Sequence, residues 1–227
     1  MIPWETIDQA EVPGFDETVT LRKRGDEFSI RTPETELMNS RIHGSEEELA
    51  KETISRLKSQ DSLDILIGGL GMGYTLAEAL KHTGQQTRIT VAELIPAIVE
   101  WNRTHMGHLS GSPLDDTRVR VETGDVMTLI NKKAAAWNAI LLDVDNGPKG
   151  LTRKSNDRIY SRSGLEKSYR ALVPGGILSV WSAADDPAFT RRLKQCRFSV
   201  ETIRVRARKP GKGARHTIWL AQKTRSK

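Results

Sequence analysis

Short apolar runs alternate with amphipathic segments from Asp64 to the end of the chain. Five strands of a parallel sheet are expected, over 65–67, 89–92, 119–122, 139–142 and 177–181, and the first, second and fourth are apolar runs typical of strands buried on both faces. Helical spacing is expected after them, over 74–82, 96–105, 126–131, 164–172 and 187–195. The last two runs, 198–205 and 216–221, are joined only by a basic loop, which predicts an antiparallel pair. The pattern therefore predicts an α/β fold with a doubly wound, Rossmann-like sheet closed by a hairpin.

The first sixty residues have a weaker pattern. Residues 1–17 look irregular, whereas apolar and polar positions alternate over 19–30 and predict a hairpin, with a third strand near 37–38. Ser45 and Glu48 have the spacing of a capping box, which predicts the start of a helix. Three parts are therefore expected: a β-hairpin element over 1–44, a linking helix over 45–60 and a Rossmann-like domain over 61–227.

Four glycines follow the first buried strand: Gly68, Gly69, Gly71 and Gly73. Glycines at a strand-to-helix turn let the backbone bend sharply and let a ligand approach closely, although they also serve helix–strand packing alone. The next strand ends on Glu93, at about the interval of 20 residues where an acid binds ribose hydroxyls. Together they favour a nucleoside site. The spacing lacks the third glycine of a dinucleotide fingerprint, which favours an S-adenosyl ligand over NAD.

Acids also stand at later strand ends. Asp125 either contacts an adenine amino group or caps the helix over 126–131, and both readings stay open. Asp143 follows a buried apolar run, and turn chemistry does not explain an acid there, so we expect a functional carboxylate. Leu94 and Val126, next to two of these acids, are also expected to bind the nucleoside.

These stretches resemble the spermidine synthase (polyamine aminopropyltransferase) family. The likeness is carried by residues 65–82, 91–103, 124–125 and 139–148. In that family a glutamate on the helix follows the glycine motif, and Glu78 matches it. The match places Met72 where the family has the aspartate that holds the amino group of the transferred chain.

The resemblance implies a transferase that moves an aminopropyl group from a decarboxylated S-adenosylmethionine-type donor to an amine. Glu93 then binds ribose, Asp125 faces adenine, and Asp143 takes a proton from the attacking amine, because an ammonium must lose a proton before it attacks. Asp145 is expected as a second, orienting carboxylate for a cationic substrate. A homodimer is implied by the resemblance alone.

Two other functions stay open. S-adenosylmethionine-dependent methyl transfer to a small molecule is favoured by Met72. A non-catalytic RNA-binding module is suggested by the net charge of +6 and the basic C-terminal residues, but few aromatic side chains accompany them. This cluster consists of Arg204, Arg206, Arg208, Lys209, Lys212, Arg215, Lys223, Arg225 and Lys227.

Several other features narrow the picture. No apolar run is long enough to span a bilayer and no signal-peptide pattern is present, so we expect a cytoplasmic protein. Cys196 is the single cysteine, which excludes an internal disulfide. His105 and His108 lack an apparent third ligand, so no metal is expected. Tyr160 and Trp181 either line the ligand site or belong to the core.

Overall fold

The computed structural model describes residues 2–144, 148, 157–208 and 212–224. Within these residues the chain forms a four-stranded sheet and a seven-stranded sheet. The small antiparallel sheet has the strand order of the sequence. Its strands are β1 (Glu5–Glu11), β2 (Thr18–Arg24), β3 (Glu27–Arg31) and β4 (Glu36–Asn39).

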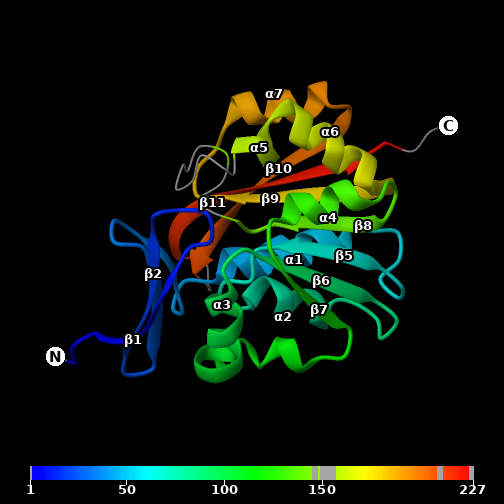
Figure 1. The fold of residues 1–227 in the computed structure, drawn as a ribbon. Helices are drawn as coiled ribbons and strands as arrows, with labels where there is room; N and C mark the ends of the chain where they lie inside the picture. Colours follow the sequence, from blue (N-terminus) through cyan, green and yellow to red (C-terminus); the bar gives the residue numbers. More distant parts are fainter. Residues whose placement is uncertain (1, 145–147, 149–156, 209–211, 225–227) are drawn as a thin grey trace.

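The large sheet has the order β10-β11-β9-β8-β5-β6-β7. Its strands are β5 (Asp64–Gly68), β6 (Arg88–Glu93), β7 (Val119–Thr123), β8 (Trp137–Leu142), β9 (Leu172–Ser182), β10 (Phe198–Arg208) and β11 (Lys212–Lys223). Strands β5 to β9 run parallel, and β11 is antiparallel to both of its neighbours. The doubly wound sheet closed by an antiparallel hairpin is therefore confirmed (Figure 1).

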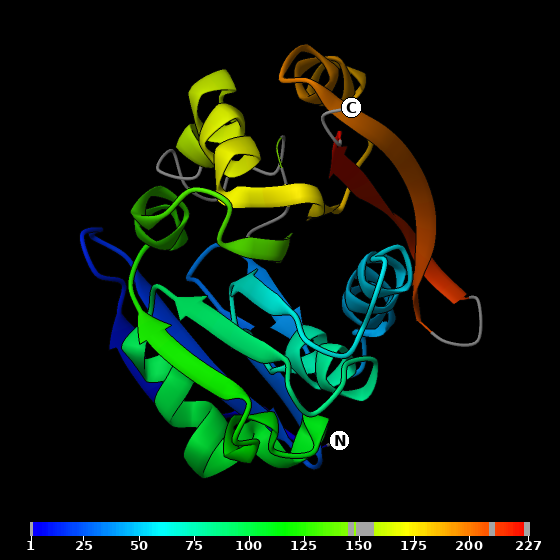
Figure 2. The same ribbon diagram turned by 90° about the vertical axis from the view of Figure 1, so that its right-hand side faces the viewer.

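Helices cover both faces of this sheet (Figures 1 and 2). They are α1 (Gly44–Ser55), α2 (Tyr74–Lys81), α3 (Pro96–Trp101), α4 (Val126–Lys132), α5 (Asp157–Tyr160), α6 (Arg162–Ala171) and α7 (Pro187–Gln195). Alternate strand residues point to opposite faces. Ile65 and Ile67 pack in the core on the side of α1, α2 and α3, and Leu66 packs in the core on the side of α4, α6 and α7. Both faces of β5 and β8 are buried, which explains the continuous apolar runs of these strands.

The interpretation of residues 1–17 as irregular is wrong, because β1 occupies residues 5–11 and pairs with β2. The register shifts between Thr6 and Asp8, as at a β-bulge. Ile7 and Ala10, the residues of β1 that pack on the core, are therefore three positions apart. A bulge breaks the alternation of two on which recognition of a strand depends.

The predicted capping box is also wrong. Helix α1 begins at Gly44 with His43 as its N-cap, and no side chain accepts a capping hydrogen bond there. The Ser45 hydroxyl lies instead 2.6 Å from Glu46 Oε2. The helix ends at Ser55, earlier than the predicted residue 60.

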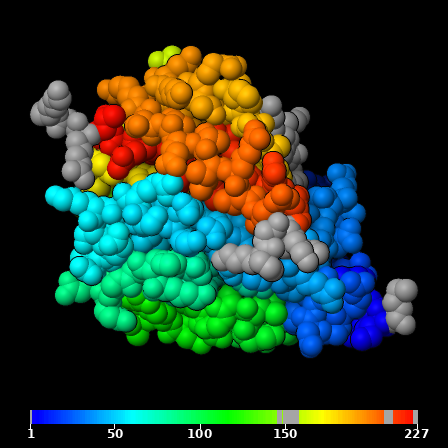
Figure 3. All heavy atoms as spheres, turned by 180° about the vertical axis from the view of Figure 1, so that it is seen from behind, coloured from blue at the N-terminus to red at the C-terminus, as the bar shows by residue number. Residues whose placement is uncertain are grey.

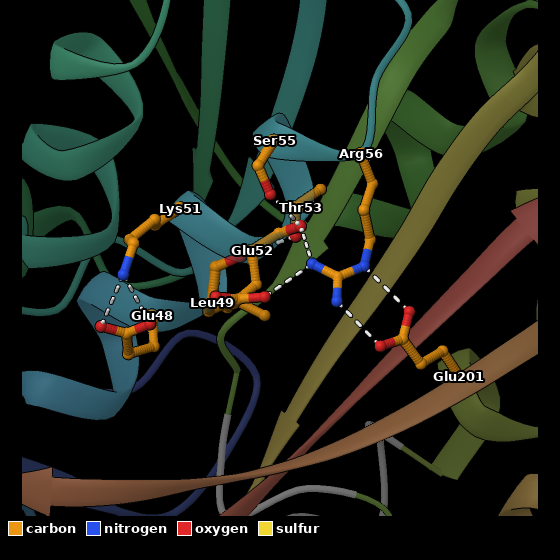
Figure 4. Close-up of polar contacts among 8 residues, drawn as sticks. All are labelled: Glu48, Leu49, Lys51, Glu52, Thr53, Ser55, Arg56 and Glu201. Atoms are coloured by element: carbon orange, nitrogen blue, oxygen red, sulfur yellow. Dashed lines mark hydrogen bonds and ion pairs between the residues drawn. The ribbon is translucent and has the colours of Figure 1, made fainter. Parts of the chain in front are cut away.

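Arg56, directly after α1, fastens this helix to the C-terminal hairpin. Its guanidinium donates two hydrogen bonds, of 2.8 and 2.9 Å, to the carboxylate of Glu201 on β10 (Figure 4). A third bond, of 2.6 Å, goes to Glu52 within α1. Seen from behind, the orange and red hairpin lies directly against the blue and cyan segments that contain α1 (Figure 3).

One further helix and one strand have other bounds in the structure than predicted. Helix α3 ends at Trp101, and the chain continues as a π-helical turn (Asn102–Met106) and two 3-10 turns (Gly107–Ser110 and Pro113–Asp115). The strand predicted over 177–181 begins earlier, at Leu172, so the Pro-Gly-Gly sequence at 174–176 lies within β9. The register between β8 and β9 shifts beside it, which accommodates proline and glycine in a strand.

The small sheet shares its buried core with the large one. Val19, Leu21, Phe28 and Ile30 belong to the same hydrophobic cluster as the α1 side of the large sheet. The division at residues 44 and 60 stays a prediction. Among the described residues, no helix is long and apolar enough to cross a membrane.

Candidate functional site

A cavity of about 350 Å³ lies at the carboxyl ends of β5, β6, β7 and β8, where open α/β sheets bind ligands. The small sheet and the start of α1 form its other walls. The residues that line it include Glu46, Gly69, Gly71, Glu93, Asp125 and Asp143. The structure thus gathers the predicted acids of three strand ends around one space.

The glycine turn presents bare backbone to this cavity. Gly69 and Gly71 both line it and have positive φ angles of +89° and +52°. A Cβ atom on Gly71 would lie 2.8 Å from the sulfur of Met38, and one on Gly69 would collide with the carbonyl oxygen of Asp143. The wall therefore requires glycine at both positions.

The other two predicted glycines lie behind the cavity wall. A Cβ on Gly68 would meet the Val126 side chain at 3.1 Å, and Gly73 is the N-cap of α2 with φ +82°. They serve packing and the turn. Met72 is fully buried in the core and does not line the cavity.

Glu93 is 6% exposed, and its carboxylate binds backbone groups of the glycine turn. Its carboxylate accepts the N–H of Leu70 at 2.8 Å and the N–H of Ile95 at 2.9 Å. These bonds join the glycine turn to the turn that follows β6. A carboxylate has further lone pairs, so ribose binding stays compatible with both bonds and stays a prediction. Leu94 lines the cavity beside it.

Asp125 is the N-cap of α4, which confirms the capping reading. Its Oδ1 accepts the N–H of Met127 at 2.8 Å, and its Oδ2 lies 3.6 Å from a guanidinium nitrogen of Arg158. The side chain is 44% exposed and lines the cavity together with Val126. The second reading, a contact with adenine, stays a prediction.

Asp143 follows the last residue of β8 and reaches the rim of the sheet, as predicted. The Thr75 hydroxyl of α2 donates a hydrogen bond of 2.5 Å to its Oδ2. Asp143 is half-buried as a residue and lines the cavity, and burial of its carboxyl group raises the pKa of Asp143 to about 6. A carboxyl group that titrates near neutral pH suits proton transfer. Asp145 lies outside the described residues.

Glu46 is a cavity carboxylate that the sequence interpretation missed. It lies in the first turn of α1 and is 8% exposed. Burial, followed by the negative charge of Asp143, raises the pKa of Glu46 to about 8. In the sequence Glu46 belongs to a run of three glutamates, which is typical of a solvated helix start.

Trp181 lines the cavity, and its indole N–H has no hydrogen-bond partner among the described residues. Tyr160, in contrast, packs edge-on against Phe189, and its hydroxyl donates to the carbonyl oxygen of Val144 at 3.1 Å. The reading of Tyr160 as a packed residue is therefore confirmed. Cys196 is buried at the end of α7, where burial raises the pKa of its thiol.

The two histidines considered as metal ligands, His105 and His108, do not line the cavity. His105 belongs to the π-helical turn, and His108 packs edge-on against Phe28 of the small sheet. In the basic C-terminal hairpin, Arg204 pairs with Asp185 at 3.1 Å, and Arg206 donates to a backbone carbonyl of the same hairpin.

The fold is that of the class I S-adenosylmethionine-dependent methyltransferases, with acids and a glycine turn at the carboxyl edge of the sheet. The family model of the spermine/spermidine synthase domain matches residues 48–197, well over half of the chain. The chain therefore belongs to the spermine/spermidine synthase family.

Curated relatives share part of their length with this chain. Polyamine aminopropyltransferase 2 of Pseudomonas aeruginosa is 28% identical over 175 residues, covering 71% of this chain and 48% of that protein. Polyamine aminopropyltransferase of Mycobacterium tuberculosis is 30% identical over 125 residues, covering 54% of this chain and 23% of that protein. The chain thus spans less than half the length of these relatives.

Solved structures agree on the fold. Spermidine synthase from Thermotoga maritima has a TM-score of 0.75 at 17% identity, with 97% of this chain and 74% of that chain covered. A spermidine synthase in complex with the transition state analogue AdoDATO has a TM-score of 0.74 at 16% identity, with 97% and 73% covered.

Proposed function

We propose that this protein transfers an aminopropyl-type alkyl group from a decarboxylated S-adenosylmethionine-type donor to an amine. The observation that carries the proposal is the position of Asp143, which lines the same cavity as the bare backbone of the glycine turn and Glu93. Membership of the spermine/spermidine synthase family and the names of the relatives support it.

The nucleoside of the donor would lie along the carboxyl ends of β5 and β6. Gly69 and Gly71 leave room for it at the turn, and Glu93 accepts hydrogen bonds from the ribose hydroxyls in addition to its two backbone donors. Asp125 lies at the adenine end, where Leu94 and Val126 supply apolar contact. The sulfonium then points toward β8.

The reaction is an in-line displacement at the carbon next to sulfur. The acceptor nitrogen forms a bond to this carbon while the carbon–sulfur bond breaks and its electron pair stays on sulfur. An alkylammonium has a pKa of about 10.4 and must first lose a proton. Asp143, with a pKa of about 6, faces the cavity as the base that takes it. The remaining contribution of the protein is alignment of nitrogen, carbon and sulfur.

One observation favours a second function, methyl transfer from S-adenosylmethionine. The site of the family aspartate is occupied by Met72, whose side chain lies in the core and outside the cavity lining. At that position the chain therefore offers no carboxylate to the amino group of a transferred aminopropyl chain. Asp145, proposed as the second carboxylate for a cationic substrate, lies outside the described residues, so it does not alter the difference from the family at Met72.

Calorimetric titration with S-adenosylmethionine, its decarboxylated form and methylthioadenosine tests the proposal. We expect the decarboxylated donor to bind more tightly than S-adenosylmethionine, and mass spectrometry to find an aminopropylated amine and methylthioadenosine as products. Preference for S-adenosylmethionine together with a methylated amine would replace this function with methyl transfer. Binding of none of the three would refute the nucleoside site itself.

A further inference from the structure

A hydrogen-bonded chain leads from the cavity to the C-terminal hairpin. The Ser45 hydroxyl, which is fully buried, lies 2.6 Å from Glu46 Oε2 and 2.8 Å from Nδ1 of His216 on β11. Glu46 lines the cavity, whereas His216 is only partly buried. These hydrogen bonds thus connect the carboxyl group of Glu46, which lines the cavity, with the partly buried imidazole of His216.

Separate packing contacts hold His216 and the start of α1, the two ends of this series of hydrogen bonds, in place. The ring of His216 packs edge-on against Trp181, with 4.7 Å between ring centroids. The start of α1 lies so close to the hairpin that a Cβ on Gly44 would come within 3.2 Å of the carbonyl oxygen of Ala207. The contact between Arg56 and β10 secures the other end of α1 (Figure 4).

The charges around Glu46 favour a proton on its carboxyl group. The charged groups that raise its pKa are Asp143, which lines the same cavity, and Glu47 on the same helix, whereas the hydrogen bond from Ser45 lowers it. Burial lowers the pKa of His216, so its imidazole is neutral at neutral pH. A protonated carboxyl group is thus joined through one hydroxyl to a neutral base.

We propose that Glu46, Ser45 and His216 form a proton path that carries the proton released by the acceptor amine from the cavity to solvent. The proposal rests on the proposed function, in which an ammonium and a sulfonium give an alkylated ammonium, a thioether and one proton per turnover. Asp143 takes this proton first, and the two cavity carboxyl groups act as a pair.

One transfer along the path leaves His216 with its proton on Nδ1 in place of Nε2, so the imidazole ring and the Ser45 hydroxyl must turn back before the next transfer. The Glu46 carboxyl proton passes to Ser45 Oγ while the Ser45 hydroxyl proton passes to Nδ1 of His216. The imidazolium then releases its Nε2 proton to solvent, and Glu46, now ionised, accepts the next proton from the Asp143 side. Ser45 and His216 touch no substrate and act through Glu46.

Ser45→Ala interrupts the path and keeps both cavity carboxyl groups. We expect kcat to fall roughly tenfold or more, with KM for donor and acceptor within about threefold of wild type. Added small buffer bases should restore part of kcat, and imidazole should do the same for His216→Ala. Ser55→Ala on the same helix, whose hydroxyl donates only to a backbone carbonyl, is the matched control. Wild-type kcat in Ser45→Ala, or a loss of kcat without rescue by bases, would overturn the path.

A measurement without turnover separates this proposal from the function. NMR titration of the His216 ring should show a second inflection near the pKa of Glu46, about 8, in wild type and in Ser55→Ala. Ser45→Ala should remove it. A His216 titration identical in all three proteins refutes the path even if aminopropyl transfer is found. Loss of the inflection in Ser45→Ala supports the path even if the transferred group proves to be methyl.

Discussion

Replacing Asp143 by asparagine should abolish turnover and, at the same time, stabilise the folded protein at high pH. Burial raises the pKa of Asp143 from 3.8 to about 6. Between these two values the folded state binds a proton that the unfolded state has lost, so stability falls as pH rises through this window. Above this pH window the carboxyl group is ionised in both states, and the folded protein keeps the full loss of stability. Asparagine keeps the shape, accepts the Thr75 hydrogen bond and carries no charge.

The size of this effect follows from the shift in pKa. A shift of about two units corresponds to about 3 kcal/mol, since each unit equals about 1.4 kcal/mol. Asp143 lines the cavity and is only half-buried as a residue, so water screening reduces this to roughly 1–3 kcal/mol. For a chain of this size, each kcal/mol changes the melting temperature by about 2–4 °C.

Thermal unfolding followed by circular dichroism between about pH 4 and pH 8 measures the difference between the two proteins. We expect the variant to melt several degrees above wild type near pH 8 and at the wild-type temperature near pH 4. Asp115→Asn, at an exposed acid in a 3-10 turn, is the control and should change little at either pH. A gain of equal size at both pH values, or a loss at pH 8, would contradict the assigned burial of the carboxylate.

Three further variants test other parts of the site. Thr75→Val removes the hydroxyl that lowers the pKa of Asp143. The acidic limb of the pH profile of kcat/KM, where activity falls as pH drops through about 6, should therefore move upward by about one pH unit. A limb at the wild-type pH would exclude Asp143 as the titrating base. Gly71→Ala should weaken donor binding in calorimetry by at least tenfold, because the new Cβ strains a positive φ and meets the sulfur of Met38 at 2.8 Å; unchanged affinity would place the donor elsewhere. Met72→Asp should lower the free energy of unfolding by about 3 kcal/mol or more in urea titration, because it buries an unpaired carboxylate in the core; a stable variant with higher turnover would show that this position faces the donor.

The large sheet and the acids at its edge were predictable because strand signals are local. A strand buried on both faces is a continuous apolar run, and its last residue lies at the carboxyl edge whatever the rest of the chain does. Glu93 and Asp143 could therefore be placed from their neighbours in sequence alone. Strand β1 could not, because a bulge separates Ile7 and Ala10 by three positions and leaves no period of two.

Glu46 could not be found because its surroundings come from distant parts of the chain. Its partner Ser45 contacts His216, which lies 171 residues away in sequence, and Asp143 reaches it from the end of β8. Local spacing offered only a capping box for Ser45, a role that the structure assigns to no side chain. Two carboxyl groups in one enclosed space repel each other when both are ionised, which lowers the folding stability of the ligand-free protein at high pH. A bound sulfonium or ammonium relieves this repulsion, so the arrangement that destabilises the empty cavity is also the one that favours a cationic ligand.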